Sequence, residues 1–153
     1  MKTRIKKIHS SKEIDFYLPD FSIDLNLPVM GEMISAGFPS PADDYIDDYI
    51  DLNKELIKNP ASTFIGRVKG SSMINSGISE GDLIIVDKAI NPKSNSIIVC
   101  FIDGDFTMKR VWKKNKSEIF LIPDNPDFPP IKVNEGNDFK LWGTVCYSIK
   151  KHI

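Results

Sequence analysis

Apolar and polar positions alternate in short runs over most of the chain after Ser62, which is the pattern of β-strands with one buried face. The runs predict strands at 63–69, 83–87, 96–102, 105–112, 118–122 and 139–148. Turn-forming residues separate them, and Asp103-Gly104 predicts a tight hairpin between two long strands. The expected fold class is therefore mainly β, a compact twisted β-sheet domain.

A helical pattern precedes Pro60. Ser40 and Pro41 have the residue types of an N-cap and a first helical position, and Asp43 completes a capping box. Apolar side chains then recur on one helical face, with aspartates opposite them: Ile46, Tyr49, Ile50, Leu56 and Ile57. Since Pro60 would end the helix, one short amphipathic helix is expected here, with its acidic face in solvent.

The first 36 residues have no sustained period. Their apolar positions alternate in part as in a strand, but Pro19 and Pro28 interrupt them. This pattern predicts an extended N-terminal arm, residues 1–36, that lies against a surface of its own chain or of a partner because it is too apolar for a linker. Residues 37–153 are then expected to form the β-rich domain.

Composition narrows the classes of function. A chain of 153 residues can bury about 70% of its unfolded surface as one domain. Its formal net charge of −1 gives no overall electrostatic reason to bind nucleic acid. Cys100 and Cys146 lie in apolar runs and are expected as core residues. No nucleotide-binding glycine pattern, signal peptide or apolar run of ~18 residues appears, so a cytoplasmic protein without a cofactor is expected.

The strand at 63–69 leads into Gly70-Ser71-Ser72, a turn that would place two hydroxyls at the rim of the sheet. Taken alone, the pattern is more typical of an ordinary turn than of a nucleophile. The two histidines, His9 and His152, lie near the chain ends, which argues against a Ser-His-Asp triad and most zinc sites. A catalytic serine without a histidine most often relies on a lysine.

Lys109 fits that role better than the other lysines. It lies inside a predicted strand, on the face shared by Thr107 and Val111. A lysine must be neutral to accept a proton, and burial in an apolar setting with no carboxylate alongside lowers its pKa. Asp103 and Asp105 belong to the hairpin turn and are not expected to pair with it. The alternative is an exposed lysine that discourages edge pairing of the sheet.

Short motifs occur in a fixed order along residues 31–150. They are Gly37-Phe38-Pro39-Ser40-Pro41-Ala42 with Tyr45, Ile50-Asp51-Leu52-Asn53, Gly70-Ser71-Ser72-Met73-Ile74, Gly77-Ile78, Gly81-Asp82-Leu83-Ile84-Ile85-Val86-Asp87, Asp103-Gly104 and Phe106-Thr107-Met108-Lys109. Each motif is weak alone, but their order and spacing resemble the UmuD-type proteins of the LexA-like S24 serine peptidase family. The chain departs from that pattern by a longer, basic start over residues 1–12.

The resemblance implies roles for individual residues. It makes Ser72 the nucleophile, Lys109 the general base and the Ala36–Gly37 bond the cleavage site. Ser71 is the competing hydroxyl, and Ser72 is preferred because the family pattern places the nucleophile directly before a methionine. The backbone N–H groups of Ser71 and Ser72 are the candidate oxyanion donors. No metal is implied.

By the same resemblance, the protein is a serine endopeptidase of the SOS response that cleaves itself when a RecA filament on single-stranded DNA stimulates it. The processed homodimer is then expected to join a UmuC-like Y-family polymerase in translesion DNA synthesis. No membrane contact and no sequence-specific DNA binding are expected.

Three alternatives stay open beside this reading. One is a non-catalytic polymerase-docking module. Another is a LexA-like or phage repressor, against which stands the lack of a pair of helices in the first 36 residues. A signal peptidase also uses serine and lysine, but it would need a membrane segment.

Overall fold

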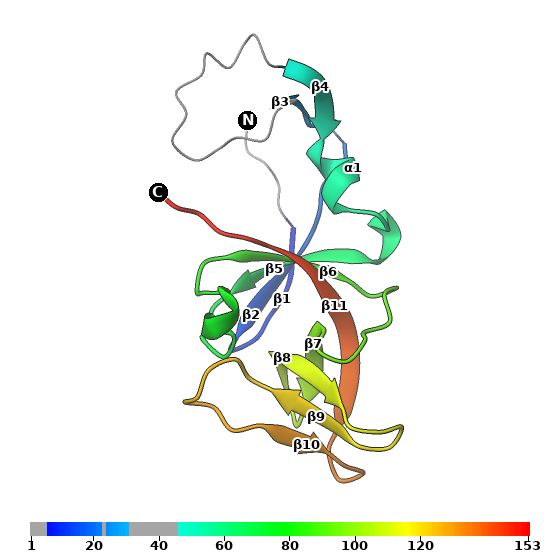
Figure 1. Ribbon diagram of the computed structural model, residues 1–153, viewed down its shortest axis with the longest axis vertical. Coiled ribbons are helices and arrows are strands. Elements are labelled where there is room, and N and C mark those ends of the chain that lie inside the picture. The colour runs from blue at the N-terminus through cyan, green and yellow to red at the C-terminus, as the bar shows by residue number, and fades with distance from the viewer. Residues whose placement is uncertain (1–5, 23, 31–45) are drawn as a thin grey trace. The chain divides into compact units, whose positions relative to one another are not determined.

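The structure, a computed structural model, describes residues 6–22, 24–30 and 46–153 (Figure 1). The chain divides into two compact units. The larger unit comprises Met1–Pro19 and Asn59–Ile153, and the smaller one comprises Asp20–Lys58. Each is described by itself.

One nine-stranded sheet forms the larger unit, in the order β1-β2-β5-β6-β11-β7-β8-β9-β10, with every neighbouring pair antiparallel. Its strands are β1 Lys6–Ser10, β2 Ile14–Leu18, β5 Thr63–Val68, β6 Leu83–Asp87, β7 Ile97–Ile102, β8 Asp105–Lys113, β9 Ile119–Ile122, β10 Ile131–Val133 and β11 Phe139–Ile149. The six strands predicted from the alternating runs are confirmed to within one residue at each end, and the mainly β class is confirmed with them.

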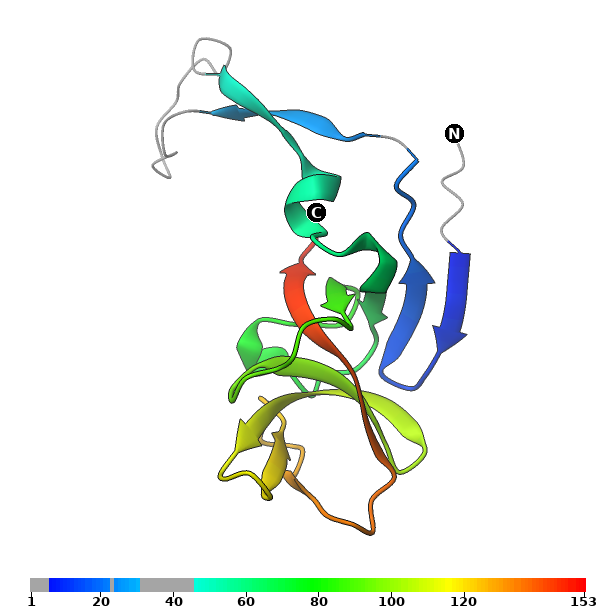
Figure 2. The ribbon, with the colours of Figure 1, turned by 90° about the vertical axis from the view of Figure 1, so that its right-hand side faces the viewer.

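The sheet curves strongly. Figure 2 shows β1 and β2 side by side at one edge of this unit, and in the strand order four strands separate β2 from β8. Even so, the ring of Phe16 on β2 lies 5.2 Å from that of Phe106 on β8 and 4.5 Å from that of Trp142 on β11. The curvature therefore brings the β1–β2 edge back against β8.

Residues on β7 alternate between two apolar clusters, as expected for a strand buried on both faces. Val99 belongs to a cluster with Phe16 and Met73, whereas Ile98 and Cys100 belong to a second cluster with Val111 and Leu121. Cys100 is fully buried in the second cluster, so the expectation of a core residue is confirmed there, whereas Cys146 is only partly buried and belongs to neither cluster. Neither cysteine forms a disulfide.

Residues 6–18 of the expected N-terminal arm form two strands of the main sheet. β2 pairs along four residues with β5, and its Ile14 and Phe16 are 0% and 1% exposed. The sequence shows their alternation but not their partner, because pairing with β5 depends on a segment about 50 residues further along. The boundary expected between residues 36 and 37 lies outside the described residues.

The β7–β8 hairpin is confirmed at Asp103-Gly104. Both residues have positive φ, 49° and 97°, the conformation that a tight two-residue turn requires. Gly104 adopts it without steric cost, and aspartate tolerates it better than most residues. The turn sets the β7–β8 register that places Lys109 opposite Ile98.

In the smaller unit, β3 Asn26–Met30 pairs with β4 Ile46–Asp51, and α1 Leu52–Leu56 follows. The helix prediction is therefore wrong over residues 46–51, where β-branched and aromatic residues in an aspartate-rich segment pair as a strand. The side chain of Asp51 accepts a hydrogen bond from Asn53 N at 3.0 Å and caps the helix there. The expected start at Ser40 lies outside the described residues.

Among the described residues, no helix has the length and apolar character needed to cross a membrane.

Candidate functional site

The serine turn follows the end of β5 and precedes a short 3-10 helix, η3 Ile74–Ser76. Met73 is buried in the core next to it and fixes the turn against the sheet. The side-chain amide of Asn125 donates to the carbonyl of Ser71 at 2.9 Å. Ser72 is 3% exposed, whereas Ser71 is exposed, so the turn directs the Ser72 hydroxyl inward.

Lys109 lies in the middle of β8 and is 4% exposed, which rules out the alternative of an exposed edge lysine. Its Nζ donates to the carbonyl of Met108 at 3.1 Å and to the hydroxyl of Thr107. Burial lowers the pKa of Lys109 below its ordinary value, and the carboxylate of Glu13 opposes part of that shift.

The structure brings Ser72 and Lys109 to one acceptor. Ser72 Oγ donates to the carbonyl oxygen of Met108 at 3.1 Å, and Lys109 Nζ donates to the same oxygen. Two side chains from segments more than 30 residues apart are therefore neighbours in a buried setting. A hydroxyl that can give up a proton and an amine that can accept one when neutral therefore share one buried site.

Glu13 is the site residue that sequence reasoning missed. It lies in the turn between β1 and β2, and its Oε2 is 3.3 Å from Ser72 Oγ and 3.7 Å from Lys109 Nζ. The expectation that no carboxylate lies alongside Lys109 is therefore wrong. No local pattern marks Glu13, because its contact with β8 depends on the curvature of the whole sheet.

A cavity of about 240 Å³ adjoins these groups. Half of the residues that line it are apolar, among them Phe106, Phe128 and Ile131, and half are polar, among them Glu13 and Lys109. Apolar walls combined with polar groups suit a short extended peptide segment.

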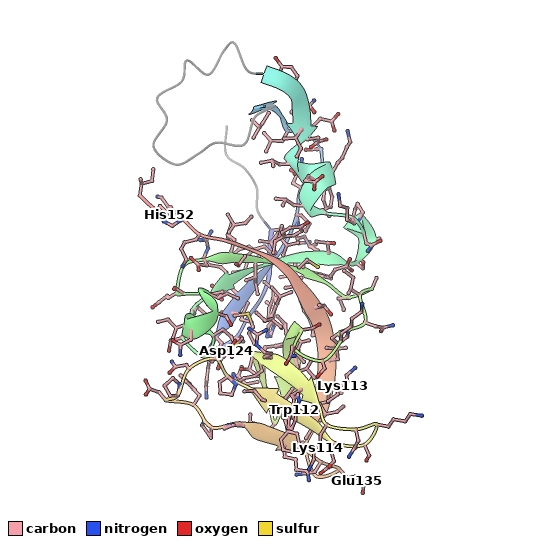
Figure 3. The ribbon with its side chains drawn as sticks, in the orientation of Figure 1. Trp112, Lys113, Lys114, Asp124, Glu135 and His152 are labelled. Atoms are coloured by element: carbon pink, nitrogen blue, oxygen red, sulfur yellow. The ribbon has the colours of Figure 1, made fainter. Side chains whose placement is uncertain are left out.

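Other residues considered from the sequence lie elsewhere or stay untested. His9 on β1 makes ring contacts with Phe16 and Phe106, and His152 lies in the C-terminal tail (Figure 3). The Ala36–Gly37 bond lies outside the described residues. The role of the backbone N–H groups of Ser71 and Ser72 stays a prediction. Within the described ranges, no group of three or more metal-ligating side chains is suited to hold an ion.

A buried serine hydroxyl and a buried lysine amine that share one carbonyl acceptor fit the residue types of serine peptidases that work without histidine. The sequence matches the family model described as Peptidase S24-like over residues 28–146, and the chain belongs to this family. The family resemblance drawn from the motifs is thereby confirmed.

Named relatives support the same assignment. Protein SamA of Salmonella typhimurium is 41% identical over 81% of this chain and 85% of its own length. Protein MucA of Salmonella typhimurium is 35% identical over 83% of this chain and 86% of its own length. LexA repressor 1 of Geobacter sulfurreducens is 38% identical over 79% of this chain, but the match spans 59% of the repressor.

Proposed function

We propose that this protein cleaves its own chain between Ala36 and Gly37, with Ser72 as nucleophile and Lys109 as general base. The observation that carries the proposal is the convergence of two buried side chains, Ser72 Oγ and Lys109 Nζ, on the carbonyl oxygen of Met108. Membership of the Peptidase S24-like family supports the reaction class.

In the proposed reaction, neutral Lys109 removes the hydroxyl proton as Ser72 Oγ attacks the carbonyl carbon of Ala36. Backbone N–H groups of the serine turn stabilise the oxyanion of the tetrahedral intermediate. The Lys109 ammonium then gives its proton to the amine of Gly37, which leaves as a new N-terminus. Water hydrolyses the acyl ester on Ser72 and regenerates both side chains.

The cellular role is proposed on the resemblance to UmuD-type proteins. A RecA filament on single-stranded DNA stimulates the cleavage, and the processed homodimer then serves as an accessory subunit of a UmuC-like translesion polymerase. The overall similarity to SamA and MucA, along more than four fifths of the chain, supports this role over that of a free protease. It operates in the cytoplasm.

Replacing each member of the pair tests the catalytic proposal. Purified full-length protein at mildly alkaline pH should give two fragments by mass spectrometry, with the cut after Ala36. Ser72→Ala and Lys109→Ala should stay intact, because each lacks one of the two groups that move the proton. Ser71→Ala, which removes the exposed neighbouring hydroxyl, is the matched control and should cleave. Normal cleavage by Ser72→Ala would overturn the assignment.

A repressor is the second candidate, because LexA repressor 1 is 38% identical to this chain over 79% of the chain's length. The strands at residues 6–18 do not favour it, since they occupy the part of the chain where a DNA-reading helix pair would be sought. Sequence-specific binding of the full-length chain to duplex DNA, lost after cleavage, would favour the repressor.

A non-catalytic docking module differs from both. It predicts that Ser72→Ala binds and supports the polymerase as wild type does. A pull-down with the polymerase that compares full-length, truncated and Ser72→Ala chains separates docking from cleavage.

A further inference from the structure

The Glu13 side chain contacts every polar group of the proposed catalytic pair. Besides its approach to Ser72 and Lys109, its Oε2 accepts a hydrogen bond from Thr107 Oγ1 at 2.7 Å and one from Met108 N at 3.4 Å. Thr107 in turn accepts a hydrogen bond from Lys109 Nζ. One carboxylate oxygen therefore lies at the centre of the site.

The backbone around Glu13 is built to hold it there. Its carbonyl oxygen accepts hydrogen bonds from Lys69 N at 2.7 Å and from Gly70 N at 3.3 Å. The absence of a side chain at Gly70 makes room, since a Cβ there would lie 3.1 Å from Glu13 Cγ and 3.5 Å from Glu13 Cβ. The next residue, Ile14, is fully buried and anchors the turn.

Among the ionisable groups around Lys109, Glu13 is the one that supplies a nearby negative charge. Cys100 on the neighbouring strand is also close, but burial raises the pKa of its thiol to about 12, so it is uncharged near neutral pH. Besides Glu13 and Lys109 themselves, Lys12 and Asp105 are the charged residue types that line the same cavity. Of the carboxylates in the described part of the chain, Glu13 is the one within 4 Å of Lys109 Nζ.

This arrangement opposes catalysis in three ways. A carboxylate beside Lys109 favours the ammonium form, which cannot accept a proton. Ser72 has a single hydroxyl proton, and Glu13 Oε2 competes with Met108 for it. The carboxylate also occupies space that a scissile peptide needs beside Ser72.

We propose that Glu13 is a positioning residue that holds Ser72 and Lys109 in a closed, charge-paired arrangement, so that self-cleavage requires its side chain to leave or lose its charge. The proposal rests on the cleavage reaction proposed above. In this proposal the β1–β2 turn, through Glu13, inhibits the active site.

Glu13→Gln in the full-length chain tests it, because glutamine keeps the shape and hydrogen bonding but removes the charge. The pH at which the cleavage rate is half-maximal should fall by about one unit, which is about tenfold faster cleavage below that pH. Glu13→Asp restores a carboxylate and should move the profile back toward wild type. The matched control is Glu135→Gln, in the turn between β10 and β11, which should leave the profile unchanged (Figure 3). A profile of Glu13→Gln that is unchanged, or a slower rate, overturns the proposal.

A second measurement does not depend on cleavage. In Ser72→Ala protein, the ¹³Cε chemical shift of Lys109 reports its titration, and adding Glu13→Gln should move the midpoint to lower pH. An identical midpoint overturns the role of Glu13 whether or not the chain cleaves. Absence of cleavage in wild-type protein at every pH, together with the shifted midpoint, would overturn the proposed function and leave the Glu13 contact standing.

Discussion

Lys109 is a buried cation with polar neighbours, and its environment determines when it can act as a base. Burial lowers its pKa, and Glu13 opposes the shift only in part. In the proposed reaction the neutral amine is the active form, so the fraction of active molecules should rise as pH rises through this lowered pKa.

The first prediction at this scale concerns pH. The rate of self-cleavage should rise with pH and level off with a midpoint below about 10.4, the ordinary value for lysine. Rates measured by gel densitometry between pH 6 and 10 test this. A rate that falls as pH rises, or that is independent of pH, would mean that Lys109 is not the base.

The second prediction concerns Asn125, which is 9% exposed and donates to the carbonyl of Ser71. Asn125→Ala removes this donor from a carbonyl that then keeps only its hydrogen bond from Ile74 N at 3.2 Å, so we expect a loss of about 1 kcal/mol of unfolding free energy. Cleavage should also slow, because the serine turn is held less firmly. Urea unfolding and cleavage rates check both effects, with Asn91→Ala, at an exposed position, as control. Equal behaviour of the two variants would contradict the role of Asn125.

Site residues differ in how far the sequence could reveal them. The local settings of Ser72 and Lys109, a Gly-Ser turn and an apolar strand, made both residues candidates, and the resemblance to the peptidase family selected them. Glu13 could not, because its contacts with Thr107 and Met108 join residues 94 and 95 positions apart. Nothing in the residues next to Glu13 encodes that long-range curvature of the sheet.

At the scale of elements, a charged network joins three segments of the larger unit. Arg110 on β8 donates to Asp124 through Nε at 3.0 Å and Nη2 at 2.6 Å, and Nη2 also donates to Ser76 of η3 at 2.8 Å. Asp124 follows β9 (Figure 3), and its backbone carbonyl accepts from Asn75 N at 2.8 Å. The network ties η3, which follows the serine turn, to β8, which carries Lys109, and to the end of β9.

The third prediction follows from this network. The Arg110 guanidinium lowers the pKa of Asp124, so the folded state gains stability from the ionised carboxylate above its ordinary pKa of 3.8. Asp124→Asn should therefore lower the unfolding free energy by about 1 kcal/mol at pH 7. The difference in unfolding free energy should shrink as pH falls below 3.8, where the carboxylate of the unfolded chain gains a proton, and should be lost once pH falls through the lowered pKa of the folded state. Urea titrations of wild type and Asp124→Asn at pH 7 and pH 3 measure this difference in unfolding free energy. A difference that grows in acid would contradict the pairing of Asp124 with Arg110.

The sequence predicts a strand or helix correctly where a single pattern of apolar spacing and residue type dominates the segment. The strands after Thr63 have clear alternation and turn residues at both ends, so their positions follow from local rules. The segment 46–51 combines apolar spacing that fits a helix with residue types that prefer strands, and pairing with β3 decides the outcome. A three-residue strand such as β10 is too short to give a period.

At the scale of the whole molecule, the N-terminal strands would hold the cleaved N-terminal fragment on the rest of the chain. The fragment that ends at Ala36 carries β2, whose Ile14 and Phe16 lie in the core, and each fully buried side chain of this kind contributes roughly 1.5–3 kcal/mol. Four backbone pairs with β5 add to this attachment. The cut alone removes none of these contacts.

The fourth prediction is that the two fragments stay together. After cleavage they should co-elute in size-exclusion chromatography under native conditions and separate in denaturant. Phe16→Ala, which leaves a cavity in the core, should loosen the complex and release the fragment more readily. A wild-type fragment that elutes alone under native conditions would contradict the attachment.

The central claim, that this chain cuts itself with Ser72 and Lys109, is tested most directly by the masses of wild-type and Ser72→Ala protein after the same alkaline incubation. The account predicts fragments of residues 1–36 and 37–153 from wild type and an intact Ser72→Ala chain. A wild-type chain that stays intact, a cut at another bond, or equal cleavage of both proteins would contradict it.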